Sequence, residues 1–152
     1  MDHTQTTGPE IQIVGIALRT DNSPPGLQKL GAHWQRFFAE KILEKIPNKA
    51  SHEIYAVYTD YESDHTKAYT LILGAKVSES GMPIPQGLVA HTIPNQAYTV
   101  VTANGSMPQA LIQCWQEIWQ SDLKRKFTTD FELYDENSNS GEGSEVKIYL
   151  AV

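Results

Sequence analysis

A carboxylate among aromatic residues is the feature of this sequence most suited to chemistry. Glu132 lies in the segment DFELYD, between Phe131 and Leu133 and two residues before Tyr134. In a β-strand, side chains alternate between the two faces, so Glu132 and Tyr134 would share one face. An ionised carboxylate among rings is costly unless a cation or hydrogen-bond donors compensate it. Glu132 is therefore a candidate counter-charge for a ligand with one positive charge, the alternative being an ordinary strand carboxylate that faces solvent.

Aromatic residues are the second element that could contact such a ligand. Each ring face that contacts a cation contributes about 0.5 to 2 kcal/mol, and rings tolerate ligands of varied shape. A broad range of ligands is therefore expected. Aromatic residues at helical spacing also fill ordinary cores, which applies most to the first two candidates. The candidates are Trp34, Phe38, Tyr58, Trp115, Trp119 and Tyr134.

Motifs for metals, nucleotides and hydrolysis are incomplete or missing. Asp60, Glu62 and Asp64 have the spacing of a calcium-loop start, but the sixth position is His65 instead of Gly and the twelfth is Leu71 instead of Glu. The 5 histidines are scattered without an HExxH pair, and neither a GxSxG nor a GxxxxGK[ST] motif is present. We expect no metal, no cofactor and no catalytic residue, and hence no enzyme.

Length, charge and cysteine content narrow the class further. The chain has 152 residues, which predicts one domain, and its 12 basic and 18 acidic side chains give a net charge of -6. This balance argues against direct binding to nucleic acid, because phosphates are bound by clustered Lys and Arg. A single cysteine, Cys114, is typical of a reducing compartment. Without an apolar leader or a long apolar stretch, we expect a cytoplasmic protein without a signal peptide or membrane contact.

The first half of the chain has the pattern of a β-α-β-β unit. Alternating apolar residues predict a strand over 10–19, and apolar residues at helical spacing predict a helix over 27–45, ending before Pro47. The runs HEIYAVYTDYE and AYTLILGAKV then indicate an antiparallel pair of strands. A segment rich in Pro and Gly, residues 80–85, separates this unit from the rest.

The second half repeats the same order. A strand-like run over 88–102 contains a break at Pro94, a helix is predicted over 108–120, and two strands follow in FTTDFELYDE and EVKIYLAV. Two such halves, 10–80 and 86–152, predict an α+β domain in which a tandem β-α-β-β repeat with pseudo-twofold symmetry forms an antiparallel sheet with two helices. The polar residues 1–9 are expected to form a disordered tail, and the loop 137–144 is expected to be mobile.

The repeat also relates Glu132 to a position in the first half. Aligning FELYDE with YAVYTD makes Ala56 the equivalent of Glu132 and Tyr58 the equivalent of Tyr134. One half therefore offers a carboxylate where the other offers a methyl group. The predicted site is asymmetric within a symmetric frame.

Several segments together resemble a known family. The paired β-α-β-β units, YAVYTDYESD with YTLILGAKV, the run IPNQAYTVV, the helix CWQEIW, DFELYD and the closing VKIYLAV are similar to the GyrI-like small-molecule-binding domain. This domain is also the effector-binding part of certain AraC-type and MerR-type multidrug-responsive transcription regulators. The likeness spans residues 10–152. It implies a pocket glutamate at Glu132 facing aromatic rings, in a standalone form without a DNA-binding domain.

The resemblance and the residues lead to one main function and two alternatives. The main expectation is a binding module that takes up cationic amphipathic or aromatic small molecules, for sequestration or for sensing through a protein partner. A first alternative is a hydrolase in which Glu132 activates water and Tyr58 or Tyr134 orients the substrate. A second is an inhibitor that contacts a nucleic-acid enzyme through its acidic surface.

Overall fold

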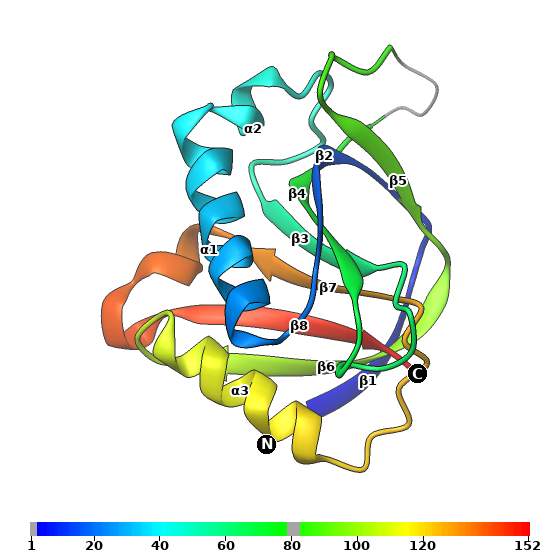
Figure 1. The fold of residues 1–152 in the computed structure, drawn as a ribbon, viewed down its shortest axis with the longest axis vertical. Helices are drawn as coiled ribbons and strands as arrows, with labels where there is room; N and C mark the ends of the chain where they lie inside the picture. The colour runs from blue at the N-terminus through cyan, green and yellow to red at the C-terminus, as the bar shows by residue number, and fades with distance from the viewer. Residues whose placement is uncertain (1–2, 79–82) are drawn as a thin grey trace.

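The chain folds around one curved sheet with helices on one of its faces (Figure 1). The computed structural model describes residues 3–78 and 83–152. Across these residues, eight strands form a single antiparallel sheet. The strands are β1 (His3–Gly8), β2 (Ile11–Thr20), β3 (Ile54–Thr59), β4 (Tyr69–Lys76), β5 (Val89–Ile93), β6 (Gln96–Asn104), β7 (Thr129–Tyr134) and β8 (Glu145–Ala151). The helices are α1 (Pro24–Ala39), α2 (Ile42–Lys45) and α3 (Gln109–Gln120).

The order of the strands confirms the predicted repeat. The sheet runs β1-β6-β8-β7-β3-β4-β2-β5, and β3 and β7, which occupy the same place in the two halves, are neighbours at its centre. Moving outward from this junction, β4 corresponds to β8, β2 to β6, and β5 to β1. The α+β class, the antiparallel sheet and the pseudo-twofold arrangement are therefore as the sequence predicts.

The N-terminal segment differs from the prediction. Residues 3–8 form β1, which pairs with β6 from His3↔Val101 to Gly8↔Gln96, so a disordered tail over 1–9 is wrong for these residues. Residues 1–2 lie outside the described residues. The strand has five exposed residues of six and contributes no apolar side chain to a core, so its stability comes from backbone pairing. By the same symmetry β5 crosses over to pair with β2 of the first half.

The first helix starts earlier and ends earlier than the predicted range 27–45. Ser23 caps it by accepting a hydrogen bond from the Gly26 backbone amide, and the two prolines that follow Ser23 occupy its first positions, where proline needs no backbone partner. It ends at Ala39 because Lys41 adopts a left-handed conformation with φ of 52°. The resulting turn lets α2 bring Ile42 into the same core as Phe37. Helix α3 begins within one residue of the prediction.

The remaining expectations concern connections. The predicted separator 80–85 falls partly on residues 79–82, which lie outside the described residues. The loop expected over 137–144 contains two short 3-10 turns, η1 (Glu136–Asn139) and η2 (Gly141–Gly143). Gly15 and Gly74 face each other across β2 and β4, where a Cβ atom on either would lie about 2 Å from the opposite backbone. This close approach requires glycine at both positions.

Candidate functional site

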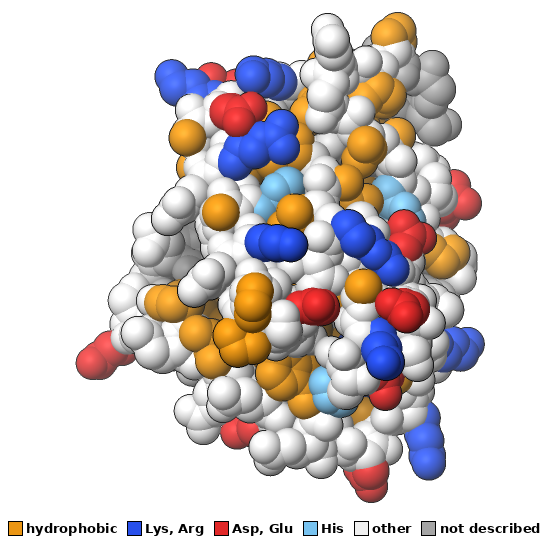
Figure 2. Space-filling view, in the orientation of Figure 1, with side chains coloured by type: hydrophobic (Ala, Val, Ile, Leu, Met, Phe, Trp, Pro, Cys, Tyr) orange, Lys and Arg blue, Asp and Glu red, His pale blue; other side chains and the backbone are white. Residues whose placement is uncertain are grey.

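A cavity between the sheet and the two main helices is lined by every residue predicted from the sequence to contact a ligand. It has a volume of about 630 Å³ and is walled by α1, α3, strands β3 and β7, and the loop after β3. Hydrophobic side chains gather over α1 and α3 at the surface (Figure 2). Of these, Leu27, Phe38 and Ile112 line the cavity and are still exposed to solvent. All seven candidates line it: Trp34, Phe38, Tyr58, Trp115, Trp119, Glu132 and Tyr134.

Glu132 lies on the wall of this cavity and is 1% exposed. Its carboxylate accepts three hydrogen bonds from neutral donors on three elements. Tyr58 on β3 donates to Oε2 at 3.0 Å, the Trp115 indole on α3 donates to Oε2 at 2.6 Å, and Tyr134 on β7 donates to Oε1 at 2.7 Å. Ala56, its expected equivalent, is its direct cross-strand partner, so a methyl group lies opposite the carboxylate.

Burial dominates the electrostatics of this carboxylate. Desolvation raises the pKa of Glu132, while the hydrogen bonds from Tyr134, Trp115 and Tyr58 act in the opposite direction. Burial, together with the nearby Glu132 charge, raises the pKa of Tyr58 and of Tyr134 well above the usual value for a phenol. Both phenols therefore remain protonated donors. Glu132 has hydrogen bonds but no basic side chain bonded to it among the described residues.

Aromatic side chains form the walls on both sides of Glu132. On the α1 side, Trp34 stacks on Phe38 at 5.9 Å and meets Tyr134 edge to face at 5.1 Å. On the α3 side, Trp115 lies 5.3 Å from Tyr58 between ring centroids. The two helices thus present rings toward a space that ends at the carboxylate. Trp34 and Phe38, the two candidates for which a core role was the stronger alternative, both line the cavity, and Trp34 also packs against the core.

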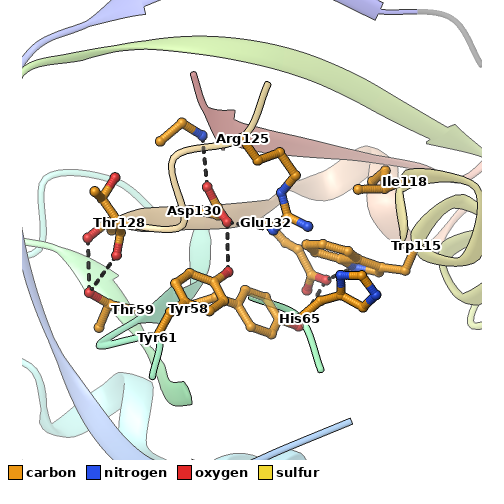
Figure 3. A network of polar contacts seen from close by, with 12 residues as sticks. Tyr58, Thr59, Tyr61, His65, Trp115, Ile118, Arg125, Thr128, Asp130 and Glu132 are labelled. Atoms are coloured by element: carbon orange, nitrogen blue, oxygen red, sulfur yellow. Dashed lines mark hydrogen bonds and ion pairs between the residues drawn. The ribbon is translucent and has the colours of Figure 1, made fainter. Parts of the chain in front are cut away.

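A second buried carboxylate, Asp130, lies two residues before Glu132 and was not singled out from the sequence. It is fully buried and forms a 2.9 Å ion pair with Arg125, whose side chain is 4% exposed (Figure 3). Asp130 also accepts hydrogen bonds from Tyr61 at 2.7 Å and from the backbone amide of Ala151 at 2.8 Å. Arg125 lines the cavity and lies over the rings of Phe127 and Trp115, at 4.3 and 5.8 Å.

The loop after β3 also contributes to the cavity in a way the sequence did not indicate. His65 lines it and stacks on Trp119, with centroids 5.6 Å apart and planes 5° apart. The loop is connected to the segment just before α1, because the Asn22 side-chain Nδ2 donates to the His65 backbone carbonyl and the Tyr69 hydroxyl donates to Asn22 Oδ1. The run of tyrosines in this region is the signal that the sequence offers, but its pattern predicts only a strand and a turn.

Other chemistry receives no support from the described residues. Within 3–78 and 83–152, no group of three or more His, Cys, Asp or Glu side chains is arranged to hold a metal ion. Cys114 is buried, and burial raises the pKa of its thiol to about 11, which leaves it protonated and unreactive. In the same residues, every helix falls short of the length and apolar character needed to span a bilayer.

The fold and the cavity together define a small-molecule-binding domain of the effector-binding class. Comparison of the sequence gives the family: residues 6–152 match Cass2, described as integron-associated effector binding protein. The chain belongs to this family. The resemblance to GyrI-like effector-binding domains is thereby confirmed.

Two curated proteins are similar to this chain over almost its whole length. YobU of Bacillus subtilis (strain 168) is 27% identical over 147 residues, which cover 93% of this chain and 91% of YobU. The transcriptional regulator BrlR of Pseudomonas aeruginosa is 29% identical over 95% of this chain, which spans only 53% of BrlR.

Among solved structures, an integron cassette protein from the mobile metagenome of Vibrio cholerae has a TM-score of 0.74 and 28% identity, covering 99% of this chain and 95% of that one. SAV2435, solved with tetraphenylphosphonium bound, has a TM-score of 0.81 and 21% identity, covering 100% and 94%. The second likeness establishes the shared fold.

Proposed function

We propose that this protein binds hydrophobic organic cations in its cavity, with the positive charge next to Glu132 and the apolar groups between the rings of α1 and α3. One observation carries the proposal: a fully buried carboxylate on an aromatic cavity wall has hydrogen-bond donors but, among the residues that the structure describes, no basic side chain bonded to it. Neutral donors stabilise the ionised form without cancelling its charge. A cation inside the cavity would supply the missing charge and would strengthen that ionised form.

The number of acceptor positions on Glu132 favours cations that do not need hydrogen bonds. A carboxylate offers about four lone-pair positions. Three are already occupied by Tyr58, Trp115 and Tyr134. A quaternary ammonium or a phosphonium has no N–H group to satisfy and interacts through charge and ring contact alone. A primary ammonium, with three donors, would remain largely unsatisfied there. The cavity volume of about 630 Å³ leaves room for several aryl groups.

Calorimetry with a pair of ions of equal shape tests this proposal. Tetraphenylphosphonium is a suitable cation, since SAV2435 binds it and shares this fold. Tetraphenylborate has the same arrangement of four rings and the opposite charge. We expect the cation to bind and the anion to bind at least 100-fold more weakly, on the order of 3 kcal/mol, because the anion would meet the buried charge of Glu132. Equal binding of both ions would show that the cavity recognises rings and not charge.

Glu132→Gln isolates the carboxylate from the rest of the cavity. The substitution keeps the volume and removes the charge, so we expect it to weaken tetraphenylphosphonium binding by about 2 kcal/mol or more, which is about 30-fold. Glu117→Gln is the matched control, because Glu117 is exposed on α3 and does not line the cavity. The control should leave the affinity within a factor of about two. Equal losses of affinity in both variants would show that Glu132 acts only through the overall charge of the protein.

The biological use that follows is sequestration or sensing without turnover. Relatives are named as regulators or effector-binding proteins, which supports a binding role. A hydrolase would need Glu132 to take a proton from water, but three donors already occupy its oxygens and leave about one lone pair. An inhibitory contact with a nucleic-acid enzyme has no specific feature of the described surface in its favour.

A further inference from the structure

Arg125 provides the cavity with a polar group distinct from Glu132. It follows α3, and its side chain reaches back to Asp130 next to the Trp115 ring (Figure 3). We infer that Arg125 forms a second ligand subsite, which accepts an uncharged oxygen acceptor, such as a carbonyl or an ether, on the same molecule whose positive charge lies near Glu132. This inference rests on the proposed function.

The hydrogen bonding of Arg125 is incomplete. A guanidinium has five N–H donors. Among the described residues, only Nη2 has an acceptor, the Asp130 carboxylate at 2.9 Å, and Nε is buried without a partner. A buried donor without a partner costs about 1 to 3 kcal/mol. Within the same residues Nη1 also has no acceptor and, unlike Nε, is not fully buried, so a ligand oxygen in the cavity that Arg125 lines can accept a hydrogen bond from it.

The position of Arg125 is also fixed before any ligand arrives. Its guanidinium lies over Phe127 at 4.3 Å, and its partner Asp130 is itself held by Tyr61 and by the backbone of β8. A donor fixed in this way loses little conformational entropy when it binds an acceptor. The Trp115 indole contacts both polar groups of the cavity, since it donates to Glu132 and its ring lies under the Arg125 guanidinium.

Charge decides between an uncharged and an anionic acceptor. The Asp130 carboxylate already neutralises Arg125, and Glu132 adds another negative charge on the same strand. An anionic group would therefore meet a site with excess negative charge, while a carbonyl oxygen would meet only free donors. The inferred ligand class is a hydrophobic cation that also carries a carbonyl or ether oxygen.

A matched pair of cations tests the subsite without any mutation. (4-Acetylphenyl)triphenylphosphonium has a carbonyl where (4-isopropenylphenyl)triphenylphosphonium has a methylene group of the same shape. We expect the acetyl compound to bind the wild-type protein about tenfold more tightly, as for a hydrogen bond from a charged donor. With a ¹³C-labelled carbonyl, the bound compound should also show a lower C=O stretching frequency than in an aprotic solvent. Equal affinities or an unshifted frequency would overturn the subsite.

Two variants locate the effect. Arg125→Met combined with Asp130→Asn removes both charges of the buried pair, which is tolerated better than removing one. The tenfold preference should fall to about one in this double variant and should persist in Glu132→Gln, where both compounds bind more weakly. A preference that survives the double variant would assign the carbonyl contact elsewhere. If both cations bind through Glu132 but equally, only the subsite fails, and if neither binds, the proposed function fails too.

Discussion

The two buried carboxylates of β7 are buried to nearly the same extent, but one is compensated by an ion pair and the other by neutral hydrogen-bond donors. Asp130 is 0% exposed and Glu132 is 1% exposed, and they lie two residues apart on the same strand. Asp130 has a guanidinium at 2.9 Å and two further donors. Glu132 has three neutral donors. Asp130 has its counter-charge and connects the loop after β3, strand β7 and the C-terminal end of β8. Glu132 has its hydrogen bonds but no ion pair within the described part of the chain, and this difference is the basis of the proposed ligand role.

The largest expected effect separates the two carboxylates by stability. Asp130→Asn leaves Arg125 buried without its counter-charge, so the free energy of unfolding should fall by about 3 to 5 kcal/mol. Urea unfolding of both proteins at neutral pH measures it. A loss below about 1 kcal/mol would show that Arg125 finds another partner and that the pair is not structural.

Glu132→Gln is the counterpart in this comparison and should behave differently with pH. Burial raises the pKa of Glu132 in the folded state above its ordinary value of 4.5, so the folded protein holds this proton more tightly than the unfolded chain. The resulting stabilisation is fully present below that ordinary value and is lost as pH rises through the folded-state pKa. Wild type should therefore lose stability relative to Glu132→Gln across that window, as measured by urea unfolding at successive pH values. A constant difference would contradict the raised pKa.

The next effect concerns ligand affinity and pH. A bound cation stabilises ionised Glu132, so protons and cation compete for the site. Tetraphenylphosphonium affinity should be constant above the pKa of Glu132 in the free protein and should fall by up to about tenfold for each pH unit below it. Calorimetry over a pH series measures this, and triphenylphosphine oxide serves as an uncharged comparison whose affinity should barely change. The same pH dependence for both compounds would point to acid unfolding instead.

A smaller effect distinguishes the donors of the two carboxylates. Tyr134→Phe removes one hydrogen bond from Glu132, so the pKa of Glu132 should rise further and the midpoint of the pH-affinity curve should move up by about one unit, or about 1.4 kcal/mol. Tyr61→Phe makes the same chemical change at Asp130 and should leave that midpoint in place. Equal shifts in both variants would mean that the loss of either hydroxyl acts on Glu132 through packing and not through the hydrogen bond from Tyr134.

The smallest expected effect concerns catalysis: we expect the protein to leave a bound ester unhydrolysed. Tetraphenylphosphonium has no bond that hydrolysis would break readily. A benzoate ester of a quaternary ammonium alcohol is therefore the sharper probe. Mass spectrometry after prolonged incubation should return this ester unchanged beyond its spontaneous hydrolysis. Product that accumulates with wild type and is lost with Glu132→Gln would make the carboxylate a general base and would replace binding by catalysis as its role.

Local pattern predicted most of the fold, and local pattern together with the resemblance to the GyrI-like family predicted Glu132 as the central residue of the candidate site. Periodicity along the chain reports which side chains share a face, so the strands around Glu132 and the pairing of the two halves followed from the residues. The two ends of α1 were harder to predict. Its start at the prolines after Ser23 and its end before Lys41 depend on backbone geometry that several residue types can adopt. The position of β1 left no apolar signal, since a strand of HTQTTG buries almost nothing.

What the sequence determined by itself is therefore the repeat, the α+β sheet and a carboxylate that shares a strand face with an aromatic ring. What only the tertiary structure decided is which polar groups meet. Tyr58, Trp115 and Tyr134 converge on Glu132 from three separate elements, and Arg125 turns back from the end of α3 to take Asp130 rather than Glu132. The physical reason is that a strand pattern fixes the face of a side chain, whereas the compensation of a buried charge depends on distances between segments that only packing brings together.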